Sequence, residues 1–160
     1  MDVTAKIVES DVLSKELNDI RKSGKQVVFT NGCFDILHVG HIRCLREAKA
    51  LGDILILAVN SDESVAANKG TQNLFYPQDE RIEILESIEY IDYIMLFSDK
   101  TVDPILRTLQ PDYHAKGTDY TKKSVPERDT VLSYGGKIAI VGDEKNHSSS
   151  QIKNEIRNNR

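Results

Sequence analysis

Cysteine is scarce in this sequence, and long apolar runs are absent. Cys33 and Cys44 have no CxxC spacing and no second cluster of metal-binding residues beside them, which disfavours a disulfide framework or a zinc site. The longest apolar run covers residues 54–59, far short of a membrane span. Residues 1–6 lack the apolar centre of a signal peptide. We therefore expect a cytoplasmic protein with no membrane partner.

A strong net charge is also lacking. The 25 acidic and 21 basic side chains leave a net charge of −4, which disfavours a general nucleic-acid binder. An anionic ligand would have to be held by local groups. The sequence has 160 residues, of which 39% are hydrophobic, enough for one core but too few for two independent domains. We find no repeat or linker, so residues 1–160 are predicted to form a single domain.

Apolar runs and helical periodicity alternate along the chain. Short apolar runs between turn signals predict strands at residues 26–29, 54–59, 93–97, 113–115 and 137–141. Apolar residues recur every three positions in two intervening segments, Ile42 to Leu51 and Ile82 to Ile88. Further helices are expected at residues 10–22, 102–109, 126–134 and 149–157. This alternation predicts an α/β fold: a Rossmann-like, doubly wound, mostly parallel sheet of five strands with helices on both faces.

In such sheets, ligands bind beyond the carboxyl ends of the strands. Residues 30–41 follow the first predicted strand and read Thr-Asn-Gly-Cys-Phe-Asp-Ile-Leu-His-Val-Gly-His. Gly32 and Gly40 lack side-chain bulk, so phosphate oxygens could approach the backbone, and the start of the next helix attracts anions. His38 and His41 would project toward one phosphate as paired donors. They could instead be ordinary polar residues at a helix entrance or metal ligands, although no HExxH motif or cysteine cluster supplies a third ligand.

The pair Gly32-Cys33-Phe34-Asp35 and His38-Val39-Gly40-His41 resembles the signature of the HxGH cytidylyltransferase-like nucleotidyltransferases. The resemblance covers about residues 25–157, the expected catalytic core, behind an N-terminal helix at about 10–22. It continues through Asn60-Ser61-Asp62, Lys69-Gly70, Arg81, Lys116-Gly117-Thr118-Asp119-Tyr120, Gly135-Gly136 and Ser148-Ser149-Ser150. The order and spacing most resemble the heptose 1-phosphate adenylyltransferase domain of ADP-heptose synthesis, in its form separate from a sugar kinase.

This resemblance implies a reaction and a role for each matching residue. AMP would pass from ATP to D-glycero-β-D-manno-heptose 1-phosphate with release of pyrophosphate, and Mg²⁺ would enter with the ATP. The resemblance implies catalytic roles for His38, His41 and Lys69, with Lys69 on a loop after the second strand. It implies ATP binding by Gly32, Cys33, Phe34, Gly40, Lys116, Asp119, Ser148, Ser149 and Ser150. Asp35, Asp62 and Arg81 would bind the sugar phosphate, no residue would ligate a metal directly, and relatives commonly form homodimers.

Several of these residues have structural alternatives. Arg81 could form a salt bridge with acidic neighbours, Asp35 and Asp62 could stabilise turns or cap helices, and a serine before the last helix could serve as its cap. His114 and His147 are expected to be structural. Residues 66–76 are predicted to be an irregular, mobile loop over the site.

The acceptor is the least determined part of the prediction. Asn73-Leu74 stands where the family has Arg-Pro, and asparagine cannot replace a bidentate phosphate clamp. Rival functions are CTP-dependent transfer to glycerol 3-phosphate or a similar alcohol phosphate, and FMN adenylyl transfer. A nucleotide-binding regulator without turnover is the alternative from a different class.

Overall fold

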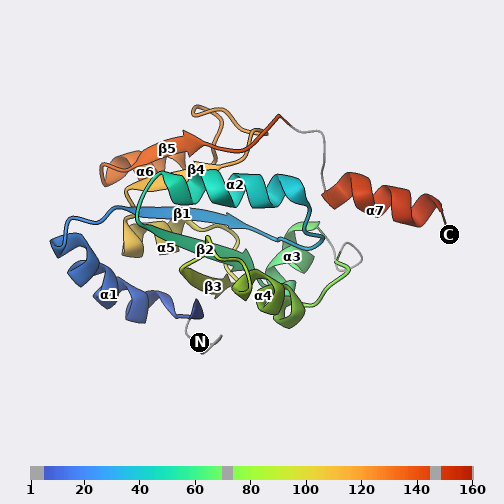
Figure 1. Cartoon of the computed structure of the whole chain (residues 1–160), viewed down its shortest axis with the longest axis horizontal. Helices are drawn as coiled ribbons and strands as arrows, with labels where there is room; N and C mark the ends of the chain where they lie inside the picture. Colours follow the sequence, from blue (N-terminus) through green and yellow to red (C-terminus); the bar gives the residue numbers. More distant parts are fainter. Residues whose placement is uncertain (1–5, 70–73, 145–148, 160) are drawn as a thin grey trace.

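The computed structural model describes residues 6–69, 74–144 and 149–159. Its five strands form one all-parallel sheet in the order β3-β2-β1-β4-β5 (Figure 1). The strands are β1 (Val27–Gly32), β2 (Ile54–Asn60), β3 (Tyr93–Phe97), β4 (Tyr113–Lys116) and β5 (Lys137–Ile140). The helices are α1 (Ser10–Lys22), α2 (Val39–Ala50), α3 (Asp62–Lys69), α4 (Gln78–Glu86), α5 (Asp103–Leu109), α6 (Arg128–Ser133) and α7 (Ser149–Asn158). The predicted α/β class and five-stranded sheet are confirmed.

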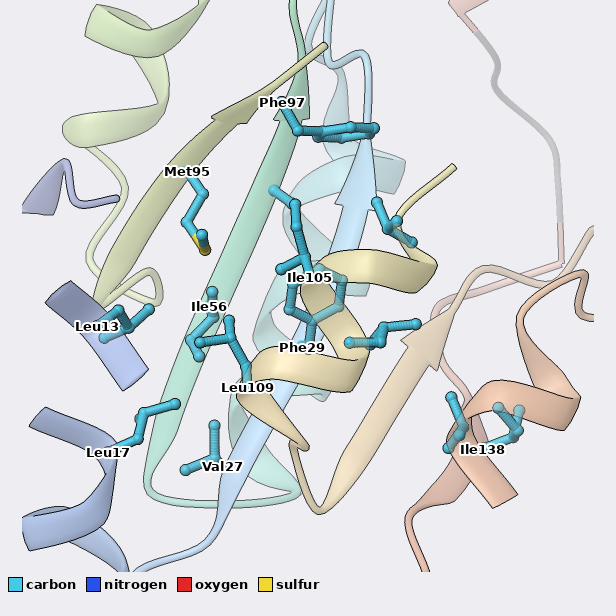
Figure 2. Packing of buried hydrophobic residues seen from close by; sticks show 14 of the residues in the cluster. Leu13, Leu17, Val27, Phe29, Ile56, Met95, Phe97, Ile105, Leu109 and Ile138 are labelled. Carbon is cyan, nitrogen blue, oxygen red and sulfur yellow. The ribbon is translucent and has the colours of Figure 1, made fainter. Parts of the chain in front are cut away.

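Alternating side chains on the strands supply two separate cores. Val27 and Phe29 of β1 face one cluster, whereas Val28 between them faces the other. The first cluster packs α1 and α5 against the sheet; Figure 2 shows Leu13 and Leu17 of α1 and Ile105 and Leu109 of α5 among its residues. The second cluster includes Leu45 and Ala48 of α2 and Ile82 and Leu85 of α4. Because the strands are covered on both faces, their sequences are almost continuously apolar.

The strand order reverses between β1 and β4. The chain passes from β1 to β2 and β3 on one side, then returns to place β4 on the opposite side of β1. β1 and β2 share six residue pairs, whereas β1 and β4 share two, Val28 with Tyr113 and Phe29 with His114. This reversal is the place where doubly wound sheets bind ligands. Figure 1 shows α7 beyond the end of the sheet toward which the strands point.

One predicted element is wrong in part. Residues 66–69 belong to α3 and are not loop, so Lys69 is the last residue of a helix. Asp62 and Glu63 in the first turn favour this helix through its dipole, and alanines at 66 and 67 favour it by propensity. Residues 74–76 lie outside helices and strands as expected, and residues 70–73, including Asn73, lie outside the described residues. Across the part of the chain that the structure describes, no helix is long and apolar enough to cross a membrane.

Candidate active site

A cavity of about 480 Å³ opens at the carboxyl ends of β1 and β4. The residues predicted from sequence that line it are Gly32, Cys33, Phe34, Asp35, His38, Gly40, His41, Lys116, Asp119 and Ser150. Asp62 and Arg81 do not line the cavity. Ser148 lies outside the described residues, and Ser149 is the first residue of α7. The fold thus gathers most of the predicted nucleotide-binding residues around one cavity at the reversal of strand order.

The two motif histidines form the start of α2. His38 is the N-cap residue, and its Nδ1 accepts a hydrogen bond from the backbone N–H of Gly40 at 3.1 Å. The Nδ1 of His41 accepts from the backbone N–H of His38 at 3.3 Å, which completes a reciprocal capping box. The ring centroids are 4.0 Å apart. The two imidazoles are therefore held side by side by the helix start itself.

These backbone contacts determine which ring nitrogen carries the proton. A ring nitrogen that accepts a hydrogen bond is unprotonated, so the proton of each neutral imidazole is on Nε2. Both rings line the cavity. Two Nε2–H donors at the positive end of a helix suit an anionic ligand such as a phosphate oxygen. This geometry favours the anion-binding interpretation of the pair over metal ligation.

The motif glycines make room for neighbouring rings of the same motif. A Cβ at Gly40 would lie 2.8 Å from Cε1 of His38, and a Cβ at Gly32 would lie 2.9 Å from the ring of Phe34. Phe34 has a φ of 52°, a backbone conformation that is costly for an aromatic residue, and its ring lies 5.3 Å from that of His41. The sequence interpretation gave these glycines a role in phosphate approach; the structure adds that they permit the placement of His38 and Phe34.

Asp35 is buried and holds two segments at the cavity. Its carboxylate accepts the backbone N–H groups of Phe75 and Tyr76, each at 2.9 Å, and pairs with Lys153 of α7 at 2.6 Å. Burial acts to raise the pKa of Asp35, but the hydrogen bonds from Lys153, Phe75 and Tyr76 outweigh it, and the pKa is lowered. These contacts are structural, but they join Asp35 to remote segments and differ from the turn or capping role considered from sequence. Lys153 was missed from sequence, although its position one turn after Ser150 on a lining helix was the available signal.

Arg81 is buried and pairs with the partly exposed Asp62. The Arg81 guanidinium has no exposed surface and donates to the backbone carbonyls of Tyr76, Cys33 and Asn60. It also pairs with Asp62 at 2.8 Å, and Asp62 accepts the backbone N–H of Gln78. The salt-bridge alternative for Arg81 therefore describes this structure, with Asp62 as the partner in place of the adjacent acidic residues. Arg81 is fully enclosed by the protein, whereas the Asp62 side chain is 44% exposed.

Lys116 and Asp119 occupy the opposite wall. Lys116 is only 8% exposed; its Nζ donates to Oδ1 of Asn31 at 3.2 Å and lies 5.1 Å from the ring centroid of Tyr120. Asp119 is exposed on the loop after β4. At the rim, Arg43 of α2 pairs with Asp143 at 2.5 Å, a contact that sequence reasoning missed because the two residues are remote along the chain. This wall therefore contains the buried cation Lys116, and polar side chains lie at its rim.

Cys33 and Cys44 are free thiols that line the cavity. Burial raises the pKa of Cys44 to about 11, so this thiol is protonated at neutral pH. Among residues 6–69, 74–144 and 149–159, no group of three His, Cys, Asp or Glu side chains is arranged to hold a metal ion.

Comparison with known proteins places this geometry in a family. The chain is 41% identical over 152 residues to the "Bifunctional protein HldE" of Geobacter sulfurreducens, which covers 95% of this chain and 31% of that protein. It is 43% identical over 142 residues to the protein of the same name from Syntrophotalea carbinolica, over 89% of this chain and 28% of that protein. The chain thus spans about a third of the length of the curated relatives it matches.

Solved structures agree with this placement. A lipopolysaccharide core biosynthesis protein from Thermoplasma volcanium superposes with a TM-score of 0.65 at 27% identity, covering 76% of this chain and all of that one. A pantoate-beta-alanine ligase from Francisella tularensis shares the fold, with a TM-score of 0.64 at 19% identity over 96% of this chain and 76% of that one. The cytidylyltransferase-like family model matches residues 29–156. The chain belongs to the cytidylyltransferase-like family.

Proposed function

We propose that this protein is an adenylyltransferase that moves AMP from ATP to a sugar 1-phosphate, D-glycero-β-D-manno-heptose 1-phosphate, giving ADP-heptose and pyrophosphate. The observation that carries the proposal is the pair of Nε2–H donors of His38 and His41, held at the start of α2 inside the cavity. Similarity to the HldE proteins and to a lipopolysaccharide core biosynthesis protein supports the sugar acceptor.

The chemistry is an in-line substitution at the α-phosphorus. An oxygen of the acceptor phosphate forms a new P–O bond to the α-phosphorus, and the bond to the β-phosphate bridging oxygen breaks, releasing pyrophosphate. No proton has to be removed from an ionised phosphate nucleophile, so the protein needs no general base for this step. Its tasks are to align the reactants and to stabilise charge on the α-phosphate oxygens. The imidazole pair performs the second task because both donors are fixed before substrate arrives.

The cations around the cavity supply the remaining binding energy. We place the triphosphate between the histidine pair and the start of α7, where Ser150 lines the cavity. Lys116 faces the same space from β4. Lys69 and Ser148 stay as predicted contacts from the family resemblance. Mg²⁺ prefers oxygen ligands and keeps several waters, so we propose that it enters on the triphosphate and neutralises charge on the leaving group.

A pyrophosphate-release assay tests the proposal. ATP and CTP are each combined with heptose 1-phosphate, glycerol 3-phosphate or FMN in the presence of Mg²⁺. Turnover with ATP and heptose 1-phosphate is the expected result. Turnover that requires CTP would refute adenylyl transfer, and tight ATP binding without turnover for any acceptor would make the chain a nucleotide-binding regulator.

Substitution of the histidines tests the mechanism. His38→Asn keeps a good helix-capping residue but removes the ring donor, so α2 should be retained while kcat falls by about 100-fold or more. His41→Asn should lower kcat similarly. In both variants, the change in ATP affinity should be smaller than the change in kcat. Val39→Ala, an exposed position in the same turn, is the matched control and should leave kcat near the wild-type value. Wild-type kcat in both histidine variants would refute the assigned role.

A further inference from the structure

A cluster of buried ionisable side chains lies behind the Lys116 wall of the cavity. It contains Lys116 and His114 of β4 and Glu127, which immediately precedes α6. Their exposed fractions are 8%, 0% and 7%. The two carboxylate oxygens of Glu127 face different partners: Oε1 lies 3.8 Å from Nζ of Lys116, and Oε2 lies 3.9 Å from Nε2 of His114. Sequence analysis gave Glu127 no role.

The main pair of opposite charges in this cluster is Lys116 and Glu127. Burial, followed by the charge of Lys116, lowers the pKa of His114 to about 3, so this imidazole is neutral at physiological pH. The Cys44 thiol, which faces Lys116 from α2, is protonated for the reason given above. Asp103 of α5 faces His114 and accepts a hydrogen bond from Thr130 at 2.5 Å. The negative charge of Glu127 therefore acts mainly on Lys116.

A buried ammonium needs such a counter-charge to stay protonated. Burial is the largest influence on the pKa of Lys116 and lowers it, while Glu127 opposes that shift. Lys116 is also positioned by Oδ1 of Asn31 at 3.2 Å and by the ring of Tyr120. These two neighbours are uncharged in their ordinary states at neutral pH, so they direct the ammonium without compensating its charge.

We propose that Glu127 is a positioning residue that keeps the Lys116 ammonium charged and directed into the cavity, where it binds the nucleotide. The role of Lys116 toward ATP follows from the proposed function; the pairing of Glu127 with Lys116 does not depend on it. Glu127 contacts no substrate in this scheme and acts through Lys116. This arrangement explains why a carboxylate is buried behind a cavity that must accept a polyanion. The carboxylate compensates the charge of the lysine without facing the ligand.

Two measurements on Glu127→Gln test the proposal separately from the proposed function. The first is an NMR titration of the side chain of Lys116 in ¹³C-lysine-labelled protein without nucleotide. Lys116 should lose its proton at a lower pH in the variant than in the wild type. The second is the dissociation constant of ATP with Mg²⁺. It should rise by about tenfold or more at about pH 9 and return toward the wild-type value at about pH 6, because one unit of pKa is a tenfold change in protonation.

The controls separate charge from packing. Glu127→Asp keeps the carboxylate and should recover most of the wild-type pH profile. Thr130→Val removes a hydroxyl from a residue that is 8% exposed on α6, the helix that Glu127 precedes, and should leave the Lys116 titration unchanged. An unchanged Lys116 titration in Glu127→Gln overturns the pairing. A shifted titration with unchanged ATP affinity at both pH values overturns the role of Lys116 toward the nucleotide and leaves the pairing intact.

Loss of folding in Glu127→Gln would itself be informative. An uncompensated buried ammonium is strongly destabilising, whereas a neutral pair is tolerated. The double variant Lys116→Met with Glu127→Gln should then fold, because no charge is left unpaired. If the double variant also fails to fold while Lys116→Met alone folds, Glu127 has a packing role unrelated to Lys116 and the proposal is wrong.

Discussion

Arg81 shows how one side chain can hold several segments around the cavity. Its guanidinium joins the carbonyls of Cys33 after β1 and Asn60 at the end of β2 to the Tyr76 carbonyl and the Asp62 carboxylate. Lysine carries the same charge but lacks the planar fork of donors that reaches four acceptors. Replacing Arg81 with lysine would leave buried carbonyls without a hydrogen-bond partner.

We predict that Arg81→Lys lowers the free energy of unfolding by about 3 kcal/mol, measured by urea denaturation. Arg128→Lys is the matched control: its partner Asp129 is fully exposed, so the change should be within about 0.5 kcal/mol. A stability near wild type combined with a raised KM for the sugar phosphate would contradict this interpretation. It would return Arg81 to the substrate-binding role implied by the family resemblance.

The sequence predicted the proximity of residues whose placement depends on local spacing. His38 and His41 are three residues apart at a helix start, and that spacing alone brings two rings together. It could not decide where the guanidinium of Arg81 points, because a carbonyl acceptor leaves no signature in sequence. Lys153 and Glu127 were missed for a related reason: their partners Asp35 and Lys116 are brought to them only by the completed sheet.

Helices and strands were predicted where their apolar pattern is long. α1 covers residues 10–22 as expected, because Leu13 and Leu17 are spaced for one buried helical face. β1 runs three residues beyond its predicted end. Residues Thr30 to Gly32 pair with Ala58 and its neighbours in β2, but they are not all apolar, so the apolar pattern ended the predicted strand too early. α3 was missed because it is short and has a weak apolar face, so periodicity gave no signal.

A buried ion pair and two cation–π contacts connect α7 to the cavity. The pair between Lys153 and Asp35 is largely buried, with exposed fractions of 14% and 2%, and the charges of Lys153 and Arg157 each lie 5.9 Å from the ring of Phe75. Removing one partner of a buried pair leaves the other charge uncompensated. The helix that carries Ser150 would then lose its buried ion pair with Asp35.

We predict that Lys153→Met increases amide hydrogen exchange across Ser149–Asn158 by about tenfold or more and raises the KM for ATP. The exposed neighbour Glu155→Gln serves as the control on the same helix and should exchange as the wild type does. Equal exchange in Lys153→Met and Glu155→Gln would show that other contacts fix α7.

Acid should destabilise the folded chain, and His114 contributes to this loss of stability below its ordinary pKa. Its pKa is about 3 when folded and 6.5 when unfolded, so the unfolded chain binds more protons between these values. The resulting stability is fully present above pH 6.5 and is lost as the pH falls through that window. The lowered pKa values of Asp35 and Asp103 act in the same direction, but only below the ordinary carboxyl value of 3.8.

Between pH 6.5 and about pH 4, the loss of stability from this group has a slope of at most about 1.4 kcal/mol per pH unit, one proton's worth. His114→Phe preserves a ring against Phe29, whose centroid lies 5.6 Å away, and removes the titration. We therefore expect urea denaturation of His114→Phe to show a shallower dependence on pH in this window than the wild type. Val131→Ala, a change at a buried apolar residue of α6, removes no titrating group and should retain the wild-type slope. Equal slopes in His114→Phe and the wild type would refute this prediction, because they would mean that His114 does not gain a proton on unfolding in that range.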